Sequence, residues 1–276
     1  MLNICQVSLE RDIPLILKNY ENFKNLYREI KIHVICPQKQ IEVFKTKLKY
    51  DEFQIISEDE IISLKDCYNI FDETSKNISY KKLFEDRINW YYQQILKILF
   101  VINFTKKNEK ILIWDADTII LKKINFFVNE HSKKYGTFSE FHRPYYKTNE
   151  KILKKLSSYY ISFLTQFIGI TKLESNFLKK QISLDDMDEK NFNNKIVNLI
   201  FKSIFTSHKI YNGSMFSEYE LIGQSNYIFK KEKQKPILTL RFGLNGKLTD
   251  LQIIICKILN FKHVTYEHSH NNKNSI

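Results

Sequence analysis

The first 120 residues alternate strand-type and helix-type patterns, and this alternation most constrains the fold. Short apolar runs occur at residues 3–9, 31–36, 53–56 and 110–114. Between them, apolar residues recur at helical spacing over 13–26, 40–49 and 87–104. Strands that alternate with helices are typical of a mostly parallel sheet covered on both faces. We therefore expect an α/β fold of Rossmann-like form, whose ligands bind at the carboxyl ends of the strands.

The second half of the chain is less regular. Strand patterns appear at 136–141 and 166–171, and a helical pattern covers 191–205. Because no stretch rich in Pro, Gly or Ser separates the halves, we expect one domain over residues 1–276, with a helical insertion around 145–210. The polar end of the chain, 269–276, is expected to be a disordered tail.

The chain is strongly basic, with 43 Lys and Arg against 31 Asp and Glu, a formal net charge of +12. Such a charge favours anionic partners, namely nucleic acid, anionic lipid surfaces or phosphorylated small molecules. No RNP-type, KH or helix-turn-helix signature is present, so nucleic acid is not an expected partner. The lysine-rich stretches 147–155 and 230–235 are either lipid-facing stripes or ordinary solvated surface.

Cysteine usage and hydropathy indicate the compartment. The four cysteines show neither C-x-x-C spacing nor a zinc pattern, so we expect free thiols in a reducing environment. The N-terminus lacks the apolar run of a signal peptide, and the longest apolar stretch, 95–104, is interrupted by Lys97. These features predict a cytoplasmic protein that is soluble or peripheral at a membrane.

The segment I-L-I-W-D-A-D-T, residues 111–118, carries the sharpest chemical signal. Here a buried strand ends at Asp115 and Asp117, and continued extended alternation would place both carboxylates on one side. Two hard oxygen ligands suit Mn²⁺ or Mg²⁺, which complete their shells with water and substrate phosphate. The competing interpretation is a pair of structural aspartates. The second D-x-D, at 186–188, lies in a polar stretch and is better explained as a solvated helix start.

Two further segments hold candidate site residues. In N-W-Y-Y-Q-Q-I-L-K (89–97), one helix face can present an aromatic ring, amides and an ammonium to a nucleotide-sugar, or can simply pack into the core. The candidates on that face are Trp90, Gln93, Gln94 and Lys97. In F-S-E-Y-E (216–220), Glu218 is a candidate general base, whereas Ser217 and Glu220 also fit a helix capping box. His268 is either a third metal ligand or a residue of the frayed tail.

These motifs occur together and in order, with S-F-L-T-Q-F-I-G (162–169) between them and F-S-E-Y-E-L-I-G (216–223) at the end. The combination resembles a bacterial family of uncharacterised, GT-A-type glycosyltransferase-like proteins, and the resemblance covers roughly residues 1–225. The chain departs from that family at Ile222, where Tyr is usual, and at 167–169, where a more polar segment is usual. Acceptor contacts are therefore expected to differ.

The resemblance implies a GT-A fold with a nucleotide-binding half, 1–120, and an acceptor-binding half, 121–270. It implies a divalent cation, Mn²⁺ or Mg²⁺, at Asp117 with help from Asp115 and His268. It also implies a nucleotide-sugar donor near Asp12, and Glu218 as the base that activates the acceptor. The implied acceptor is a bacterial surface glycan or glycolipid, as in capsule or lipooligosaccharide synthesis. Contact with the cytoplasmic face of the inner membrane fits such an acceptor.

Two rival functions remain open at this level. A haloacid-dehalogenase-like phosphatase would use Asp115 as nucleophile, Asp117 as acid and the later pair at 185–186. Its pattern places Thr or Val where Ile119 stands and usually lies nearer the N-terminus. A nucleic-acid-binding module is suggested only by the net charge. We expect an inverting glycosyl transfer, in which a metal ion neutralises the donor diphosphate.

Overall fold

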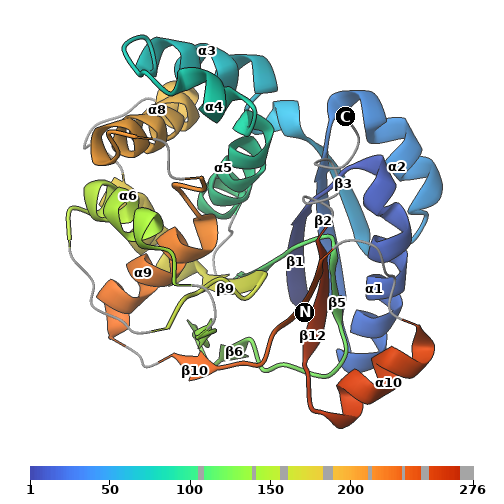
Figure 1. Ribbon diagram of the computed structural model, residues 1–276. Coiled ribbons are helices and arrows are strands. Elements are labelled where there is room, and N and C mark those ends of the chain that lie inside the picture. The colour runs from blue at the N-terminus through green and yellow to red at the C-terminus, as the bar shows by residue number, and fades with distance from the viewer. Residues whose placement is uncertain are drawn as a thin grey trace.

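A five-stranded sheet forms the centre of the computed structural model (Figure 1). The structure describes residues 1–104, 109–138, 141–155, 161–182, 189–210, 213–231, 234–243 and 249–267. The strand order is β3-β2-β1-β4-β9, and neighbours pair in parallel except β4 and β9, which are antiparallel. The strands are β1 (Leu2–Val7), β2 (Ile30–Cys36), β3 (Phe53–Ser57), β4 (Lys110–Trp114) and β9 (Phe167–Thr171). This arrangement confirms the predicted α/β fold with a mostly parallel sheet.

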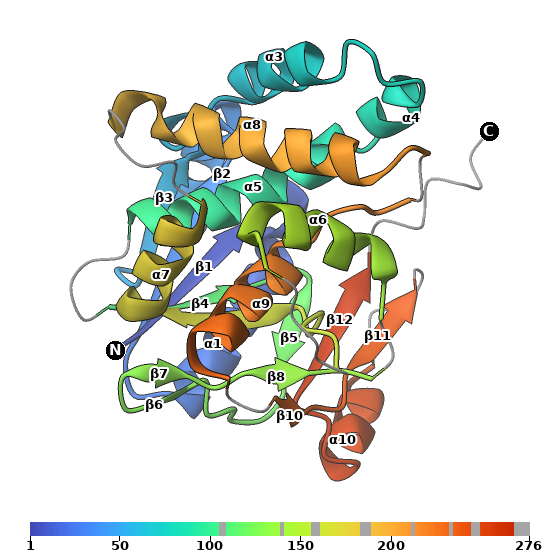
Figure 2. The same cartoon turned by 90° about the vertical axis from the view of Figure 1, so that its left-hand side faces the viewer.

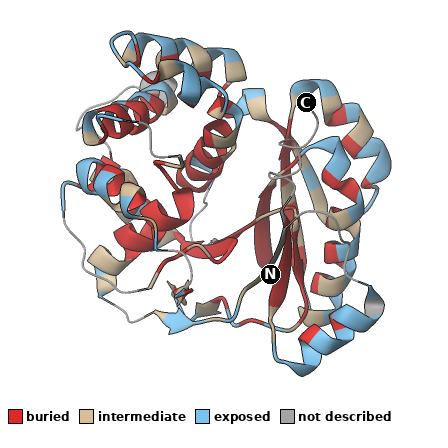
Figure 3. Cartoon of the chain, in the orientation of Figure 1, coloured by how far each residue is buried: buried red, intermediate tan, exposed pale blue. Residues whose placement is uncertain are grey.

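Helices cover both faces of this sheet. On one face lie α1 (Ile13–Leu26) and α2 (Ile41–Lys47), whose apolar sides pack on the sheet (Figure 1). The other face is covered by α5 (Ile88–Asn103), and the remaining helices of a larger helical layer pack around it (Figure 2). These are α3 (Leu64–Thr74), α4 (Lys81–Glu85), α6 (Arg143–Leu153), α7 (Lys172–Ile182), α8 (Glu189–Ser207) and α9 (Glu218–Lys230). The sheet and the inner faces of these helices form the buried core (Figure 3).

A smaller sheet of order β11-β12-β5 lies beside α1. It consists of β5 (Thr118–Ile120), β11 (Leu240–Gly243) and β12 (His263–Glu267), with α10 (Asp250–Ile258) packed against it. The Asn19 amide of α1 fixes β5, because it donates to the Thr118 carbonyl at 3.0 Å and accepts from the Ile120 amide at 3.0 Å. Two-residue strands form further pairs: β6 (Phe127–Val128) with β7 (His131–Ser132), and β8 (Tyr135–Gly136) with β10 (Lys235–Pro236).

The second half differs in part from its prediction. The strand predicted at 166–171 is confirmed as β9, which joins the central sheet as an edge strand and interrupts the otherwise helical segment 145–210. The strand expected at 136–141 is reduced to β8 and a bridge at Thr137, and residues 139–140 lie outside the described part. The predicted tail, 269–276, also lies outside the described residues.

Burial agrees with the interpretation of the thiols and of the apolar stretches. All four cysteines are buried and unpaired. Burial raises the pKa of Cys36 and of Cys67 to about 12, as expected for thiols that act as small core residues. Within the described part of the chain, no helix is both long enough and apolar enough to span a bilayer.

Candidate active site

The candidate site begins where β4 ends. The Asp115 amide continues the ladder by donating to the Gln166 carbonyl beside β9 at 3.1 Å. The chain then turns sharply, and the Thr118 amide donates to the Asp115 carbonyl at 3.0 Å. The expectation that Asp115 and Asp117 share one side of a continuing extended segment is therefore wrong, since they are the first and third residues of a β-turn. Both residues are half-buried at the carboxyl end of β4.

A buried ammonium links this turn to α9. Lys97 on α5 forms an ion pair with Asp115, and its Nζ lies 2.7 Å from Oε1 of Glu218 at the start of α9. The Lys97 and Glu218 side chains are each only 4% exposed, so the pair is shielded from solvent. Three residues from distant parts of the sequence thus form one charged cluster, which we call the Lys97 cluster: Lys97, Asp115 and Glu218.

The protonation of the Lys97 cluster follows from burial and charge. Burial alone would lower the pKa of Lys97, but the carboxylates of Asp115 and Glu218 outweigh it and raise that pKa above its usual value. Burial raises the pKa of Glu218, and the charge of Asp115 adds to this effect, whereas Lys97 opposes it. Lys97 is therefore a permanent cation, and Glu218 holds a proton more readily than an exposed glutamate.

The helix α5 contributes one further polar contact to the Lys97 cluster, through Gln94. Two other predicted residues of this helix, Trp90 and Gln93, are not part of the cluster. The Gln94 Oε1 accepts a hydrogen bond from the Glu218 amide at 3.2 Å, which fixes the first turn of α9 against α5. Trp90 is half-buried, and its ring stacks with the Arg87 guanidinium at 4.4 Å. Gln93 is also half-buried, and the structure gives it no hydrogen bond to the described residues of the Lys97 cluster. Gln94 and Lys97 thus both face Glu218, and the expected contact of this helix face with a nucleotide-sugar stays a prediction.

The start of α9 shows how Ser217 and Glu220 are used. Ser217 caps the helix by accepting from the Glu220 amide at 3.4 Å. The expected capping box does not form, because the Glu220 carboxylate turns away to Ser162 and Phe163. It accepts from the Ser162 hydroxyl at 2.5 Å and from the Phe163 amide at 2.9 Å. Glu220 therefore anchors the segment before β9, while Glu218 faces Lys97.

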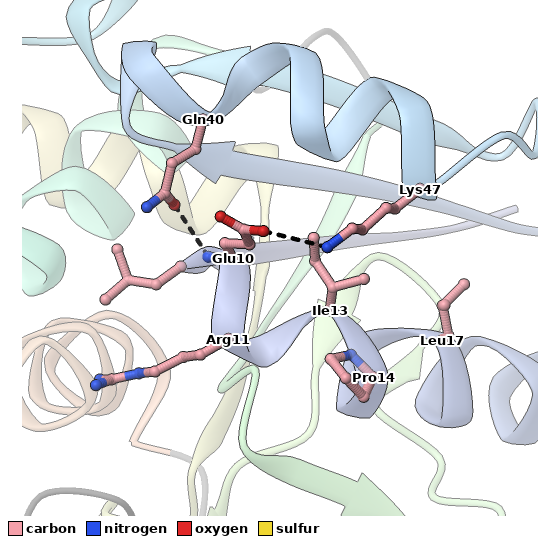
Figure 4. A pocket seen from close by; sticks show the side chains of 8 residues that line it. Glu10, Arg11, Ile13, Pro14, Leu17, Gln40 and Lys47 are labelled. Carbon is pink, nitrogen blue, oxygen red and sulfur yellow. Dashed lines mark hydrogen bonds and ion pairs between the residues drawn. The ribbon is translucent and has the colours of Figure 1, made fainter.

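Asp12 has a local partner in the structure. Its carboxylate accepts from the Leu9 amide at 2.8 Å and so closes the short 3-10 turn that precedes α1. Beside this turn lies a cavity of about 840 Å³ (Figure 4). Its lining consists of Leu9, Glu10, Arg11, Ile13, Pro14, Leu17, Gln40 and Lys47. Asp12 is adjacent in sequence to this lining, and its expected contact with a nucleotide stays a prediction.

The predicted metal ligands fit a cation only in part. Asp115 and Asp117 supply two half-exposed carboxylates, which is the small protein contribution that Mg²⁺ and Mn²⁺ require when a phosphate completes the shell. The residues that the structure describes contain no group of three or more acidic, His or Cys side chains placed to hold a metal. His268, the expected third ligand, lies outside the described residues, as do the second D-x-D at 186–188 and Asp185.

Three polar residues at the site were missed by the sequence interpretation. The Tyr219 ring lies 5.0 Å from the Lys97 Nζ, and burial beside Asp115 and Glu218 raises its pKa well above the usual value. Gln6 and Ser8 lie at the end of β1, which pairs with β4, and both are buried. Gln6 Nε2 and Ser8 Oγ find no hydrogen-bond partner among the described residues. Their position after the first parallel strand was the signal available in the sequence.

Fold and site thus define an α/β protein with a charged cluster at the carboxyl edge of its central sheet. The chain belongs to a family of unknown function, DUF6492, whose model matches residues 11–171. No curated protein matches the chain.

Solved structures resemble the chain at low sequence identity. A crystal structure of an active-site mutant of LgtC shares 10% identity at a TM-score of 0.41, covering 96% of this chain and 87% of that one. The crystal structure of mouse xyloside xylosyltransferase 1 in its apo form shares 10% sequence identity at a TM-score of 0.41. The match covers 97% of this chain and 98% of that one. The glycosyltransferase GlyE of Streptococcus pneumoniae TIGR4 shares 12% sequence identity at a TM-score of 0.33. The match covers 73% of this chain and 43% of that one. At such TM-scores, function has to be inferred from the residues of this chain.

Proposed function

We propose that this chain is a metal-dependent glycosyltransferase that moves a sugar from a nucleotide-sugar donor to a hydroxyl group of a bacterial surface glycan or glycolipid. The observation that carries the proposal is the Lys97 cluster beside Asp117, at the carboxyl end of a central parallel strand. Ligands of open α/β sheets bind at this edge, and a buried cluster of opposed charges there is typical of a catalytic site.

On the donor side, Asp117 and Asp115 would hold the Mn²⁺ or Mg²⁺ ion, which supplies positive charge to neutralise the donor diphosphate. Lys97 keeps Asp115 in place, because the ion pair fixes one carboxylate oxygen from the side of α5. The unpaired polar atoms of Gln6 and Ser8 lie next along the same sheet edge. Buried groups of this kind call for a partner, and the nucleotide is the partner that we propose.

On the acceptor side, we assign Glu218 the role of general base. It would take the proton of the acceptor hydroxyl while the hydroxyl oxygen attacks the anomeric carbon, from which the nucleoside diphosphate leaves on the opposite face. This single displacement inverts the anomeric configuration. The raised pKa of Glu218 supports the role, since it makes this carboxylate a stronger base than an exposed glutamate. The Gln94 contact with the Glu218 amide holds the base in position.

Nucleotide binding tests the donor side. Calorimetry with UDP, GDP and CMP, with and without Mn²⁺, should find one nucleotide that binds only with the metal. Asp117→Asn should weaken that binding about tenfold or more, equivalent to about 1.4 kcal/mol. Asp51→Asn, a change at an exposed aspartate, is the matched control. Metal-independent affinity that Asp117→Asn leaves unchanged would refute the donor side of the proposal.

Turnover tests the acceptor side. Glu218→Gln should lower the rate of sugar transfer about 10²-fold or more and leave nucleotide affinity within about twofold, because a base acts on the chemical step. Equal transfer rates for Glu218→Gln and wild type would exclude that role. Hydrolysis of p-nitrophenyl phosphate that depends on Asp115, without sugar transfer, would instead favour the haloacid-dehalogenase-like alternative.

A further inference from the structure

The helix α10 exposes an unusual amount of apolar surface. Four residues of α10 and the residue that follows the helix have large apolar side chains that are 44–75% exposed. They are Leu251, Ile254, Ile255, Ile258 and Leu259. Single exposed leucines are normal on a protein surface, but a contiguous apolar face marks a site of interaction.

The spacing of these residues shows that they form one face. Leu251, Ile254, Ile255 and Ile258 follow the i, i+3, i+4, i+7 pattern, which aligns side chains along one side of a helix. The opposite side is already used, because Ile253 and Cys256 are buried against β5 and β12. The helix α10 therefore has two apolar faces, of which the outer one lacks a partner within the described residues. In Figures 1 and 2, α10 lies at the lower edge of the molecule, and Figure 3 shows exposed surface there.

Lysines surround the carboxyl end of this face. Lys257 lies on α10 and is exposed. Lys122 and Lys262 both donate to the Asn260 side chain just after the helix, at 3.1 and 3.2 Å. An apolar helix face flanked by lysines is the pattern of helices that lie in the interface of an anionic bilayer, where the apolar side chains enter the acyl region and the lysines meet phosphate groups.

We infer that the outer face of α10 docks the protein onto the surface of a membrane rich in anionic phospholipid. The inference concerns a surface outside the candidate active site and does not depend on the proposed transfer reaction. It also places the lipid contact on α10, and not on the lysine-rich stretches 147–155 and 230–235.

Two other occupants fit the surface less well. Residues 268–276 have the sequence HSHNNKNSI and hold one large apolar side chain, Ile276, against five exposed ones on and after α10. A second copy placed by two-fold symmetry would present the same patch, which supplies apolar side chains but, among the residues named above, no carboxylate to pair with the lysines. An anionic bilayer satisfies both the apolar face and the lysines.

Vesicle sedimentation of the full chain tests the inference. Vesicles of phosphatidylcholine mixed equally with phosphatidylglycerol should pellet the wild type, and pure phosphatidylcholine vesicles should pellet much less of it. The double variant Ile254→Ser with Ile258→Ser should lose binding about tenfold or more, because two anchoring side chains are removed. Leu173→Ser on α7, where Leu173 is 52% exposed, is the matched control and should bind like the wild type.

Three results would overturn the inference. The first is wild-type protein that stays in the supernatant with anionic vesicles. The second is equal binding by the wild type and by the folded double variant, with folding checked by circular dichroism and with the single Ile258→Ser variant as the milder change. The third is a wild-type dimer in sedimentation velocity that the double variant converts to a monomer, which would assign the face to a second copy.

Discussion

Replacing Lys97 with Met would test whether the buried charges are correctly assigned. Methionine matches the length of the lysine stem but removes the ammonium, so Asp115 and Glu218 lose their shared cation. Glu218 then remains as a carboxylate whose side chain is 4% exposed, with the charge of Asp115 nearby. Burying a charge without a counterion is strongly unfavourable.

The size of the effect follows from the geometry. At the 2.7 Å between Lys97 Nζ and Glu218 Oε1, Coulomb attraction in a medium of effective dielectric constant about 20 amounts to about 6 kcal/mol. Desolvation of the ammonium offsets part of this attraction, and breaking a buried pair typically costs about 3–5 kcal/mol. We expect Lys97→Met to lower the free energy of unfolding by about that amount at pH 8.

The penalty should depend on pH. Loss of Lys97 removes the cation that lowers the pKa of Glu218, so that pKa rises further above its unfolded-state value. The native state then binds a proton more tightly than the unfolded state, and stability falls as pH rises through the folded pKa. The variant should therefore lose less stability at pH 5 than at pH 8, because the lower pH favours the neutral, protonated form of Glu218. The raised pKa of Lys97 in the wild type has no effect in this range, because both states are protonated.

Urea unfolding followed by circular dichroism at both pH values provides the measurement. Lys45→Met, which breaks the exposed pair with Glu42, is the matched control and should change stability by less than about 1 kcal/mol. Adding Glu218→Gln to Lys97→Met should restore part of the loss at pH 8. A loss below about 1 kcal/mol at pH 8, or the same loss at both pH values, would refute the assignment of a buried ionic cluster.

Three further changes test the packing around the site. Glu220→Ala should lower the free energy of unfolding by about 2–3 kcal/mol in urea titrations, because Ser162 and Phe163 lose a buried acceptor; a neutral change would contradict the anchoring role. Gly223→Ala places a Cβ 2.2–2.5 Å from the Phe163 ring, so thermal unfolding should show a loss of about 1–3 kcal/mol that Phe163→Leu partly relieves. His263 is buried and its pKa is lowered to about 4, so it stays neutral while the unfolded chain takes up a proton below about pH 6.5. His263→Phe should reduce the loss of stability between pH 7 and pH 4, and an unchanged slope would contradict this.

The fold of the first half could be predicted because its signals are local. The strand 110–114 coincides with β4, and the helix 13–26 coincides with α1, because a change of hydrophobic period marks both ends. The small sheet and α10 were not predicted. The strand β12 pairs with β11 and with β5, and β5 lies more than 140 residues earlier in the chain, so the pairing with β5 is not visible from a short window of sequence.

The candidate site could be predicted residue by residue but not as an arrangement. The strand end pointed to Asp115 and Asp117, and helical spacing pointed to Gln94 and Lys97. That Lys97 bridges Asp115 and Glu218 depends on the packing of α9 against α5, which no spacing encodes. The use of Glu220 was misread for the same reason: a capping box is a local pattern, whereas its partners, Ser162 and Phe163, are almost 60 residues away.

The antiparallel pairing of β9 has a practical consequence for work with fragments of this chain. The family model ends at residue 171, the last residue of β9. A fragment cut before residue 167 would leave β4 with open backbone amides and carbonyls along its length. Unprotected sheet edges recruit strands from other molecules, so such a fragment should aggregate. A soluble fragment built on the first half of the chain therefore has to include the strand contributed by the second half.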